Sequence, residues 1–585
     1  MKYTKLLFLG LSLFVFFPQF ANAREVRVQI LVTSDIHARI FPYDFINDRP
    51  LPYSMAHVYT LVQAARAQPG SNIILLDNGD LIQGSPAGYY ANFVQQEKYN
   101  LFSRVLNEMR FDAATIGNHD IEAGPEVYNR LIKEFGFPWL GANVINVQTG
   151  KPFFVPYTII NRQGIRIAIL GLTTPGVPTW LPEKLWQGMQ FQELAESARY
   201  WVQHIREREN PDAIVGLFHS GMGSPRPNPG QTMVENASQY VALTVPGFDV
   251  IFTGHDHREW LTTVTNSIGE EVKIVGPGPF GENIGAAELV FFRNSERHFE
   301  LIDVKSELIS TRRMAPDQIF FQKFKEDADS IIAFSSRVVG RLNGRMASLD
   351  AFFGSAAFVD LVHDLQLRMT QADISFTAPL SFNETINAGP MRVRDFFNLY
   401  RFENYLYVMQ LTGEEIRNYL EFSYSLWLNT MENSQGHMLL FREDESGRPQ
   451  ADGQGRFRLR HPSFNFDSAA GIRYTVDVSK PEGQRITIIE MEDGTPFHTE
   501  KVYRVAINSY RGSGGGDHLT EGAGIPHDKL RERIVWTSEN DLRSEMMDYF
   551  REQKEVTPLA RNNWKIIPES WVQPARERDL KLLLP

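Results

Sequence analysis

The sequence predicts an α/β protein with two domains, for two reasons. Its 585 residues are more than a single hydrophobic core usually organises. Its first half also alternates short apolar runs rich in Ile, Val and Leu, typical of buried strands, with helix-forming stretches such as Met55–Ala67 and Leu194–Arg208. In domains built this way, the loops that follow the strands gather at one edge of the sheet. Ligand-binding residues in those loops are therefore expected to lie together.

A charged, helix-forming stretch separates the two domains. Residues 317–339 contain neither Gly nor Pro, and they follow a strand-rich segment. We interpret this stretch as the connection between the domains; the alternative is an ordinary helix of the first domain. The predicted division is a first domain at 24–315, a linker helix at 316–344, a second α/β domain at 345–565 and a C-terminal tail at 566–585.

The first 23 residues predict an export signal. Lys2 and Lys5 precede an apolar run that ends in the small-residue pattern Ala21-Asn22-Ala23. The run is shorter than a membrane span usually is, although an uncleaved anchor is the alternative. No comparable apolar stretch follows. We expect an exported protein, periplasmic or secreted, with no membrane span in the mature chain.

Charge and cysteine content narrow the function classes. The formal charge is −11, and removing the two lysines of the export signal makes it −13. An acidic protein is poorly suited to grip the phosphate backbone of a nucleic-acid polymer, so none is expected as a partner. Small anionic substrates stay open, because a bound metal sets the local field. With no cysteine, the chain has neither disulfides nor a thiolate nucleophile.

Five apolar runs in the first half of the chain end in residues that commonly bind metals. They lead into the segments SDIH, DNGD, GNHD, FHS and GHDH. The candidate ligands in these segments are Asp35, His37, Asp80, Asn118, His219, His255 and His257. A set of oxygen and nitrogen ligands without sulfur suits ions of the Mn, Zn, Co or Fe type. Each short segment is weak evidence by itself, but five in order predict a metal site.

The number of ligands is enough for two divalent metal ions. We expect one ion to be held by Asp35, His37 and His257, and the other by Asn118, His219 and His255. Asp80 would bridge the two ions, which a carboxylate can keep close despite their mutual repulsion. Such a pair activates a water molecule, and its natural target is a phosphorus centre.

This ordered series of segments resembles the calcineurin-like metallophosphoesterases. Further segments, GNHDIEAG, GANV and GPGPFGENIG, resemble the exported 5′-nucleotidase and 2′,3′-cyclic-nucleotide 2′-phosphodiesterase/3′-nucleotidase family, as does the long segment that ends at Trp180. The resemblance covers residues 25 to 560. It implies an N-terminal four-layer α/β/β/α sandwich that holds the metals and a C-terminal α/β domain that binds the nucleotide.

The resemblance also assigns a role to His119. In that family the equivalent histidine does not bind a metal, but stabilises the transition state or protonates the leaving oxygen. The residue three positions later, an Asp in 5′-nucleotidases and Glu122 here, would orient His119, and Asp120 is the competing candidate. The alternative is a purely structural histidine.

Residues of the second domain are candidates for substrate binding. The segments PSFNFD and NSYRGSGGGD resemble those that hold a base between two aromatic rings, here Phe464 and Tyr510, with Phe466 as the alternative to Phe464. Stacking suits any base, because every base has a π face. Asp517 is a candidate for a sugar contact, although it lies one residue later than in the family.

Two arginines of the second domain, Arg394 and Arg401, are candidates for contacts with the ligand or between the domains. The surface salt bridges that arginines commonly form are the alternative.

The predicted activity is the metal-dependent hydrolysis of nucleotide phosphoesters. Glu122 favours 5′-nucleotides, whereas the segment that ends at Trp180 favours 2′,3′-cyclic and 3′-nucleotides. One alternative is an enzyme that hydrolyses non-nucleotide esters on the same fold. The other is an exported nucleotide-binding protein without activity, which the complete ligand set disfavours. The oligomeric state stays open.

Overall fold

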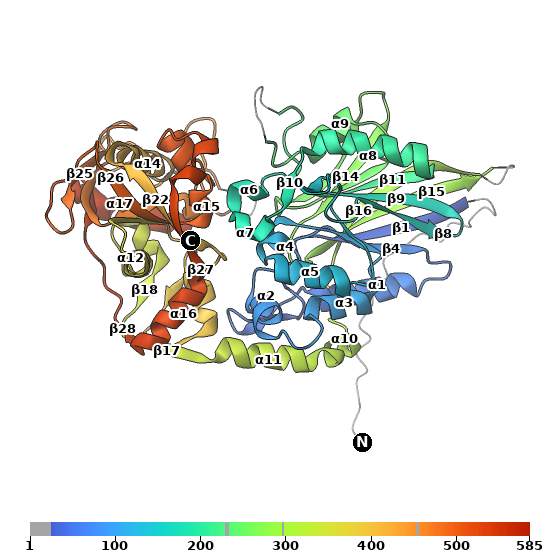
Figure 1. Cartoon of the computed structure of the whole chain (residues 1–585), viewed down its shortest axis with the longest axis horizontal. Coiled ribbons are helices and arrows are strands. Elements are labelled where there is room, and N and C mark those ends of the chain that lie inside the picture. Colours follow the sequence, from blue (N-terminus) through green and yellow to red (C-terminus); the bar gives the residue numbers. More distant parts are fainter. Residues whose placement is uncertain (1–24, 228–232, 295–297, 452–454, 585) are drawn as a thin grey trace, which may run out of the picture.

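The computed structural model describes residues 25–227, 233–294, 298–451 and 455–584. The predicted export signal therefore lies outside the described residues. Two lobes lie side by side, with the chain passing from one to the other along the edge of the molecule (Figure 1).

Two six-stranded sheets stack face to face in the first lobe (Figure 1). The first sheet, in spatial order, consists of β16 (Phe299–Ser310), β15 (Asn283–Arg293), β1 (Glu25–Thr33), β4 (Ile73–Asp77), β5 (Ala113–Thr115) and β6 (Trp139–Leu140). The second sheet consists of β13 (Glu259–Thr265), β14 (Glu271–Pro277), β12 (Val250–Thr253), β11 (Ala213–His219), β9 (Ile165–Thr173) and β8 (Tyr157–Arg162). The strands that precede the candidate ligands are parallel within each sheet: β1, β4 and β5 in the first, β11 and β12 in the second.

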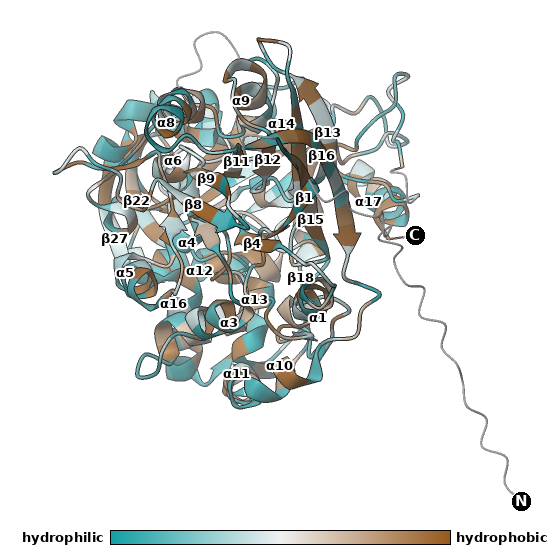
Figure 2. Cartoon of the chain, turned by 90° about the vertical axis from the view of Figure 1, so that its right-hand side faces the viewer, coloured by the Kyte–Doolittle hydropathy of each residue, from teal (hydrophilic) through white to brown (hydrophobic). Residues whose placement is uncertain are grey.

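Apolar residues on both faces of the strands explain this stacking. Val28 and Ile30 of β1 are fully buried against the other sheet, whereas their neighbour Leu31 points to the opposite face and packs under helices. Strands covered on both faces read as continuous apolar runs, because neither set of alternate side chains meets water. β1 and β15 are accordingly largely brown in Figure 2.

Helices cover the outer face of each sheet. On the first sheet lie α1 (Met55–Arg66), α3 (Leu101–Met109) and α5 (Pro125–Glu134), and on the second lie α8 (Leu194–Glu209) and α9 (Ser238–Thr244). The order of layers is therefore α/β/β/α, and the predicted fold class is confirmed.

The connection between the lobes differs from the single helix predicted at 316–344. Two helices, α10 (Gln318–Lys323) and α11 (Lys325–Ser336), meet at Phe324, and β17 (Val338–Leu342) follows as a strand of the second lobe. Phe320, Phe324 and Ile331 are buried in the core of the first lobe. Both helices are therefore anchored to the first domain, as in the alternative interpretation. The polypeptide enters the second domain at the end of α11, where Phe334 packs into that domain's core.

The second lobe is built on a five-stranded mixed sheet. Its strands, in spatial order, are β23 (Ser468–Ala470), β19 (Ile374–Thr377), β26 (Val502–Asn508), β22 (Tyr405–Thr412) and β27 (Ile534–Asp541). The helices packed around it include α12 (Ala357–Thr370), α13 (Val393–Leu399), α14 (Gly413–Trp427) and α16 (Leu542–Gln553). The domain is α/β, as predicted.

Residues 566–585, predicted as a tail, include an ordered part of the second domain. α17 (Glu569–Leu583) packs on its core through the fully buried Ala575. Asp579, also fully buried, accepts hydrogen bonds of 2.9 Å from the backbone N–H groups of Met438 and Leu439.

None of the helices in the described part of the chain is both long and apolar enough to cross a membrane.

Candidate active site

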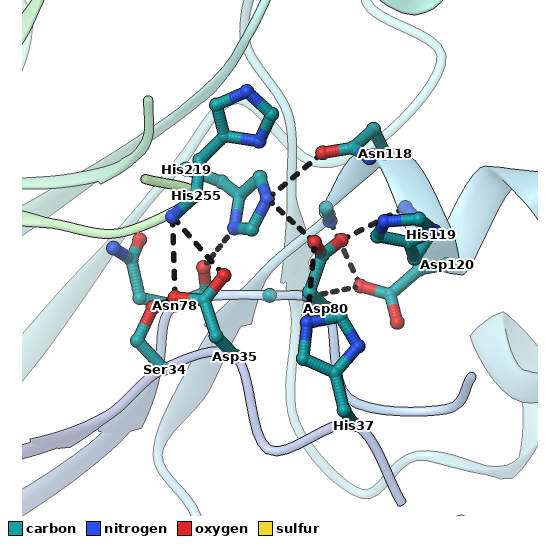
Figure 3. A network of polar contacts seen from close by, with 12 residues as sticks. Ser34, Asp35, His37, Asn78, Asp80, Asn118, His119, Asp120, His219 and His255 are labelled. Carbon is teal, nitrogen blue, oxygen red and sulfur yellow. Dashed lines mark hydrogen bonds and ion pairs between the residues drawn. The ribbon is translucent and has the colours of Figure 1, made fainter. Parts of the chain in front are cut away.

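The candidate metal ligands converge where the parallel strands of both sheets end. Their ligating atoms form two groups, each with all atoms within 4.8 Å of one another, and Asp80 belongs to both. The first group is Asp35, His37, Asp80 and His257, and the second is Asp80, His219 and His255. Asn118 lies beside the second group, with its Oδ1 3.1 Å from Nε2 of His219 (Figure 3). The structure thus brings all seven residues together.

The backbone is unusual at five of these seven residues. Asp35, His37 and Asp80 have φ angles of 51°, 47° and 54°, and His255 and His257 have φ angles of 73° and 55°. Residues other than glycine rarely adopt this left-handed conformation, and such strain is commonly concentrated at functional sites. The surrounding fold therefore imposes the backbone conformation that turns these side chains toward one another.

Hydrogen bonds to backbone carbonyl groups orient two of the histidines. Nδ1 of His219 lies 2.7 Å from the carbonyl oxygen of Asn78, and Nδ1 of His37 lies 3.1 Å from that of Gln83. Because a carbonyl can only accept, each Nδ1 carries a proton and donates it, so in the neutral ring that binds a metal the lone pair is on Nε2. The Nε2 atom of His37 lies 2.9 Å from Nε2 of His257. Metal-binding histidines are typically held in this way, so the donor set fits a metal centre.

Asp80 carries its charge in the centre of the cluster. Its side chain is 1% exposed, and its Oδ2 lies 3.2 Å from Nε2 of His219. Burial raises the pKa of the Asp80 carboxyl, but the histidines around it outweigh burial and hold the pKa well below its usual range. An ionised carboxylate shared by both groups is what a bridging ligand requires.

Asp120 fixes the loop that carries Asp80. Its carboxylate accepts hydrogen bonds from the backbone N–H groups of Gly117 (2.8 Å), Asp80 (3.0 Å), Leu81 (2.9 Å) and Ile82 (3.2 Å). Gly117 is packed so closely that a Cβ there would lie 2.2 Å from Oδ1 of Asp80. Asp120 therefore holds the backbone, and the ring of His119 has another partner.

That partner is Glu122. Both residues lie on α4 (Asn118–Glu122), where three positions apart means the same helix face, and Nδ1 of His119 is hydrogen-bonded to Oε2 of Glu122. Burial lowers the pKa of His119, but the carboxylates of Asp80 and Glu122 raise it overall to about 10. The two carboxylates therefore favour the protonated ring of His119, with Nδ1 held by Glu122.

The two predicted base-binding rings lie together in the second domain, although they are not parallel. The centroids of Phe464 and Tyr510 are 6.5 Å apart and their planes meet at 86°. A base sandwich needs parallel planes, so a ring must rotate before a base can enter. Phe466, the alternative to Phe464, is fully buried and stacks on Trp427, so it belongs to the core.

Arg511, which the sequence analysis did not single out, ties the two ring-bearing segments together. Its guanidinium is buried and donates hydrogen bonds to the carbonyl of Phe464 (2.8 Å), the carboxylate of Asp467 (3.1 Å) and the carbonyl of Gly515 (2.7 Å). The sequence around it is rich in glycine. Its order comes from this buried ion pair, whose partner is forty-four positions away in the sequence.

The remaining candidates of the second domain lie at different places. Arg394 forms a 2.7 Å ion pair with Asp48 of the first domain, so it is an interdomain residue. Arg401 and Asp517 are exposed, and Asp517 adopts a φ of 63° at the start of a helical turn. Neither lies among the candidate metal ligands.

The two domains meet close to the candidate metal centre. α7 (Glu183–Trp186) contributes Lys184, whose ammonium lies 3.7 Å from the ring centroid of Tyr405 and 3.1 Å from the carbonyl oxygen of Glu539. α6 (Val177–Trp180) contacts α15 (Ser509–Gly512), the helix that carries Tyr510. A cavity of about 560 Å³ beside Lys184 and Tyr405 lies at this boundary, and none of the candidate metal ligands lines it.

Comparison with known proteins gives matches in both domains. Residues 28–259 match the family of calcineurin-like phosphoesterases, and residues 338–521 match the 5′-nucleotidase C-terminal domain. A trifunctional nucleotide phosphoesterase of Bacillus subtilis is 27% identical over 94% of this chain, which spans 39% of the length of that protein. A 2′,3′-cyclic-nucleotide 2′-phosphodiesterase/3′-nucleotidase of Yersinia enterocolitica is 26% identical over 95% of this chain and 90% of its own length.

Among solved structures, a 5′-nucleotidase precursor of Thermus thermophilus superimposes with a TM-score of 0.62. The match covers 93% of this chain and all of the other, at 21% identity. This likeness shows a shared fold.

Proposed function

We propose that this chain hydrolyses nucleotide phosphoesters to nucleoside and phosphate. It is a phosphoric ester hydrolase that joins a calcineurin-like phosphoesterase domain to a 5′-nucleotidase C-terminal domain. The observation that carries the proposal is the arrangement around Asp80. Six other ligand-type residues, from four separate segments, surround this one buried carboxylate, and a second domain brings two aromatic rings to the same boundary.

The proposed site holds two divalent metal ions. Asp35, His37 and His257 would hold one, and Asn118, His219 and His255 the other, with Asp80 shared. Such ions, of the Mn, Zn, Co or Fe type, would neutralise charge on the phosphate and lower the pKa of a water nucleophile.

His119 is the proposed acid of the reaction. Its ring is 28% exposed, so its Nε2 can reach a substrate while Nδ1 stays bonded to Glu122. A protonated imidazole in this position can donate a hydrogen bond to the charge that develops on the leaving oxygen. Positioned acids of this kind typically contribute ~10²–10⁴ in rate.

The second domain would select nucleotides among phosphoesters. Phe464 and Tyr510 are proposed to open from their edge-to-face arrangement and stack on the two faces of a base. Stacking contributes about 1–3 kcal/mol per base and tolerates any base. Asp517 and Arg401 stay candidates for contacts with the sugar and phosphate.

Among nucleotides, 2′,3′-cyclic and 3′-monophosphates are the proposed preference. The Yersinia relative named for that activity matches nearly the full length of both chains. Trp180, which ends the segment that resembles this branch, lies beside the proposed metal ligand His255. Export to the periplasm or the medium is proposed from the basic, apolar and small-residue pattern of residues 1–23.

Phosphate release from the 5′-, 3′- and 2′,3′-cyclic monophosphates of adenosine, measured side by side with Mn²⁺, tests the proposal. We expect turnover of the cyclic and 3′ substrates, with the 3′-nucleotide detected as an intermediate of the cyclic reaction. Asp80→Asn should abolish all of it. Preference for the 5′-ester would overturn the proposed regiochemistry, and inactivity on all three with metals bound would overturn the nucleotide assignment.

A further inference from the structure

One of the proposed metal ligands, His255, is held by two residues that are not themselves ligands. Its Nε2 lies 2.8 Å from Oε1 of Glu235, and its ring stacks on Trp180 with centroids 5.4 Å apart and planes at 26°. We propose that Glu235 and Trp180 are positioning residues that hold His255 in the tautomer and orientation in which it binds its metal ion. This inference rests on the proposed two-metal site.

The contact with Glu235 determines which nitrogen of His255 is available. A carboxylate accepts hydrogen bonds, so the proton of the neutral imidazole lies on Nε2 and the lone pair on Nδ1. His37 and His219 have the opposite arrangement, because backbone carbonyls accept from their Nδ1 atoms. His255 is thus the histidine of the second group that depends on a charged side chain for its tautomer. A charged acceptor also makes the imidazole a stronger ligand than a carbonyl does.

Glu235 is fixed in place by the loop that follows β11. Ser220 Oγ donates a 2.9 Å hydrogen bond to the carbonyl of Glu235, and the N–H of Gly221 donates a 2.8 Å bond to Oδ1 of Asn236. Gly223 has a φ of 69°, and a Cβ there would lie 1.8 Å from the carbonyl oxygen of Asn236. The backbone of this segment is therefore packed directly on the loop that begins with the ligand His219, and the Glu235 side chain, which is 44% exposed, extends from it to His255.

Trp180 is packed with similar closeness. A Cβ on Gly176 would lie 2.3 Å from its indole ring, so only glycine at that position lets the ring lie where it does. The ring rests on the imidazole of His255, and α6, which carries it, also contacts α15. One hydrogen bond from a single nitrogen does not fix the plane of the imidazole ring. The flat surface of the stacked indole restricts that rotation.

Loss of these contacts to His255 should reduce the affinity for only one of the two proposed metal ions. Removing an outer hydrogen-bond partner of a ligating histidine typically costs ~10–100-fold in metal affinity. Loss of Glu235 should weaken the ion held by Asn118, His219 and His255, and leave the ion held by Asp35, His37 and His257 bound nearly as before.

Titration of the metal-free, full-length chain with Co²⁺ tests this, followed by calorimetry and by the visible absorption of the bound ion. The wild-type chain should bind two ions. Glu235→Ala should weaken one of them by ~10–100-fold, with a change in its absorption band. Glu235→Gln, which keeps an acceptor oxygen without the charge, should fall between the two. Glu259→Gln is the matched control. Glu259 is exposed and follows His255 by four positions, but it accepts a hydrogen bond from Asn283 and not from the histidine.

A second pair of variants tests the ring contact. In Trp180→Phe, the ion that includes His255 among its ligands should bind with an affinity close to that of the wild type. Trp180→Ala should weaken this ion alone, as Glu235→Ala does. Thermal unfolding of the metal-free variants checks that the fold is intact. Unchanged Co²⁺ affinities in Glu235→Ala, or equal weakening of both ions, would overturn this inference alone. A wild-type chain that binds fewer than two ions would overturn the two-metal proposal and this inference with it.

Discussion

The pairing of His119 with Glu122 allows a quantitative prediction for Glu122→Gln. The Glu122 side chain is only 5% exposed and that of His119 28%, so water screens the pair weakly. An opposite charge in direct contact typically shifts a pKa by about 1–3 units. At 1.36 kcal/mol per unit, the carboxylate stabilises the imidazolium by about 1.4–4 kcal/mol relative to the neutral ring.

If that stabilisation is used in the reaction, the glutamine variant should lower kcat by ~10–1,000-fold, whereas His119→Asn should lower it by ~10²–10⁴-fold. The double variant should be no slower than His119→Asn, because Glu122 acts only through the ring. Steady-state phosphate release at saturating Mn²⁺ measures all three. Glu126→Gln is the control, since Glu126 is exposed on the neighbouring helix. A full kcat in Glu122→Gln, or losses that multiply in the double variant, would show that Glu122 does not act through His119.

Four other residues or sites allow predictions of their own. Chelation should abolish activity, and added Mn²⁺ should restore it in the wild type but not in Asp80→Asn, as phosphate release will show. Phe464→Ala and Tyr510→Ala should each raise KM by ~5–150-fold, the equivalent of about 1–3 kcal/mol of stacking, with less effect on kcat. Arg511→Leu leaves the buried Asp467 unpaired, and guanidinium denaturation should show a loss of about 3–5 kcal/mol in the second domain. Burial lowers the pKa of His363 to about 3, against ~6.5 in the unfolded chain, so the unfolded chain binds the proton first as pH falls. His363 should therefore contribute a loss of about 2 kcal/mol of stability between pH 7.5 and pH 5, and urea unfolding of His363→Gln should show a loss that is smaller by that amount.

The fold class and the candidate ligands could be predicted because both depend on local sequence patterns. β4 and β12 are buried on both faces, so their apolar residues form an unbroken run that ends at the sheet edge. Asp80 follows the end of β4 by three positions and His255 follows the end of β12 by two, and the stacking of the two sheets brings these positions to one edge.

The conformation of the ligand loops could not be predicted from the sequence. The φ values of 73° and 55° at His255 and His257 are unfavourable for any residue with a Cβ, and nothing in the segment GHDH requires them. They are imposed by contacts with distant parts of the chain, such as the bond from the N–H of His255 to the carboxylate of Asp35.

Charged residues with distant partners also escaped the sequence analysis. Arg511 is buried and Glu235 is partly exposed, and both lie in polar, glycine-containing segments that give no sign of a specific partner. Their partners, Asp467 and His255, are forty-four and twenty positions away. The helix α17 escaped for a related reason: its polar composition hides a narrow apolar face that includes Ala575.

Anomalous X-ray diffraction from crystals grown with Mn²⁺ would show whether two metal ions share Asp80. If they do, two anomalous peaks should appear ~3.5–4 Å apart, with the Asp80 carboxylate between them. The peaks should have His37 and His257 beside one and His219 and His255 beside the other. A single peak, or two peaks with Asp80 bound to only one of them, would show that Asp80 is not shared.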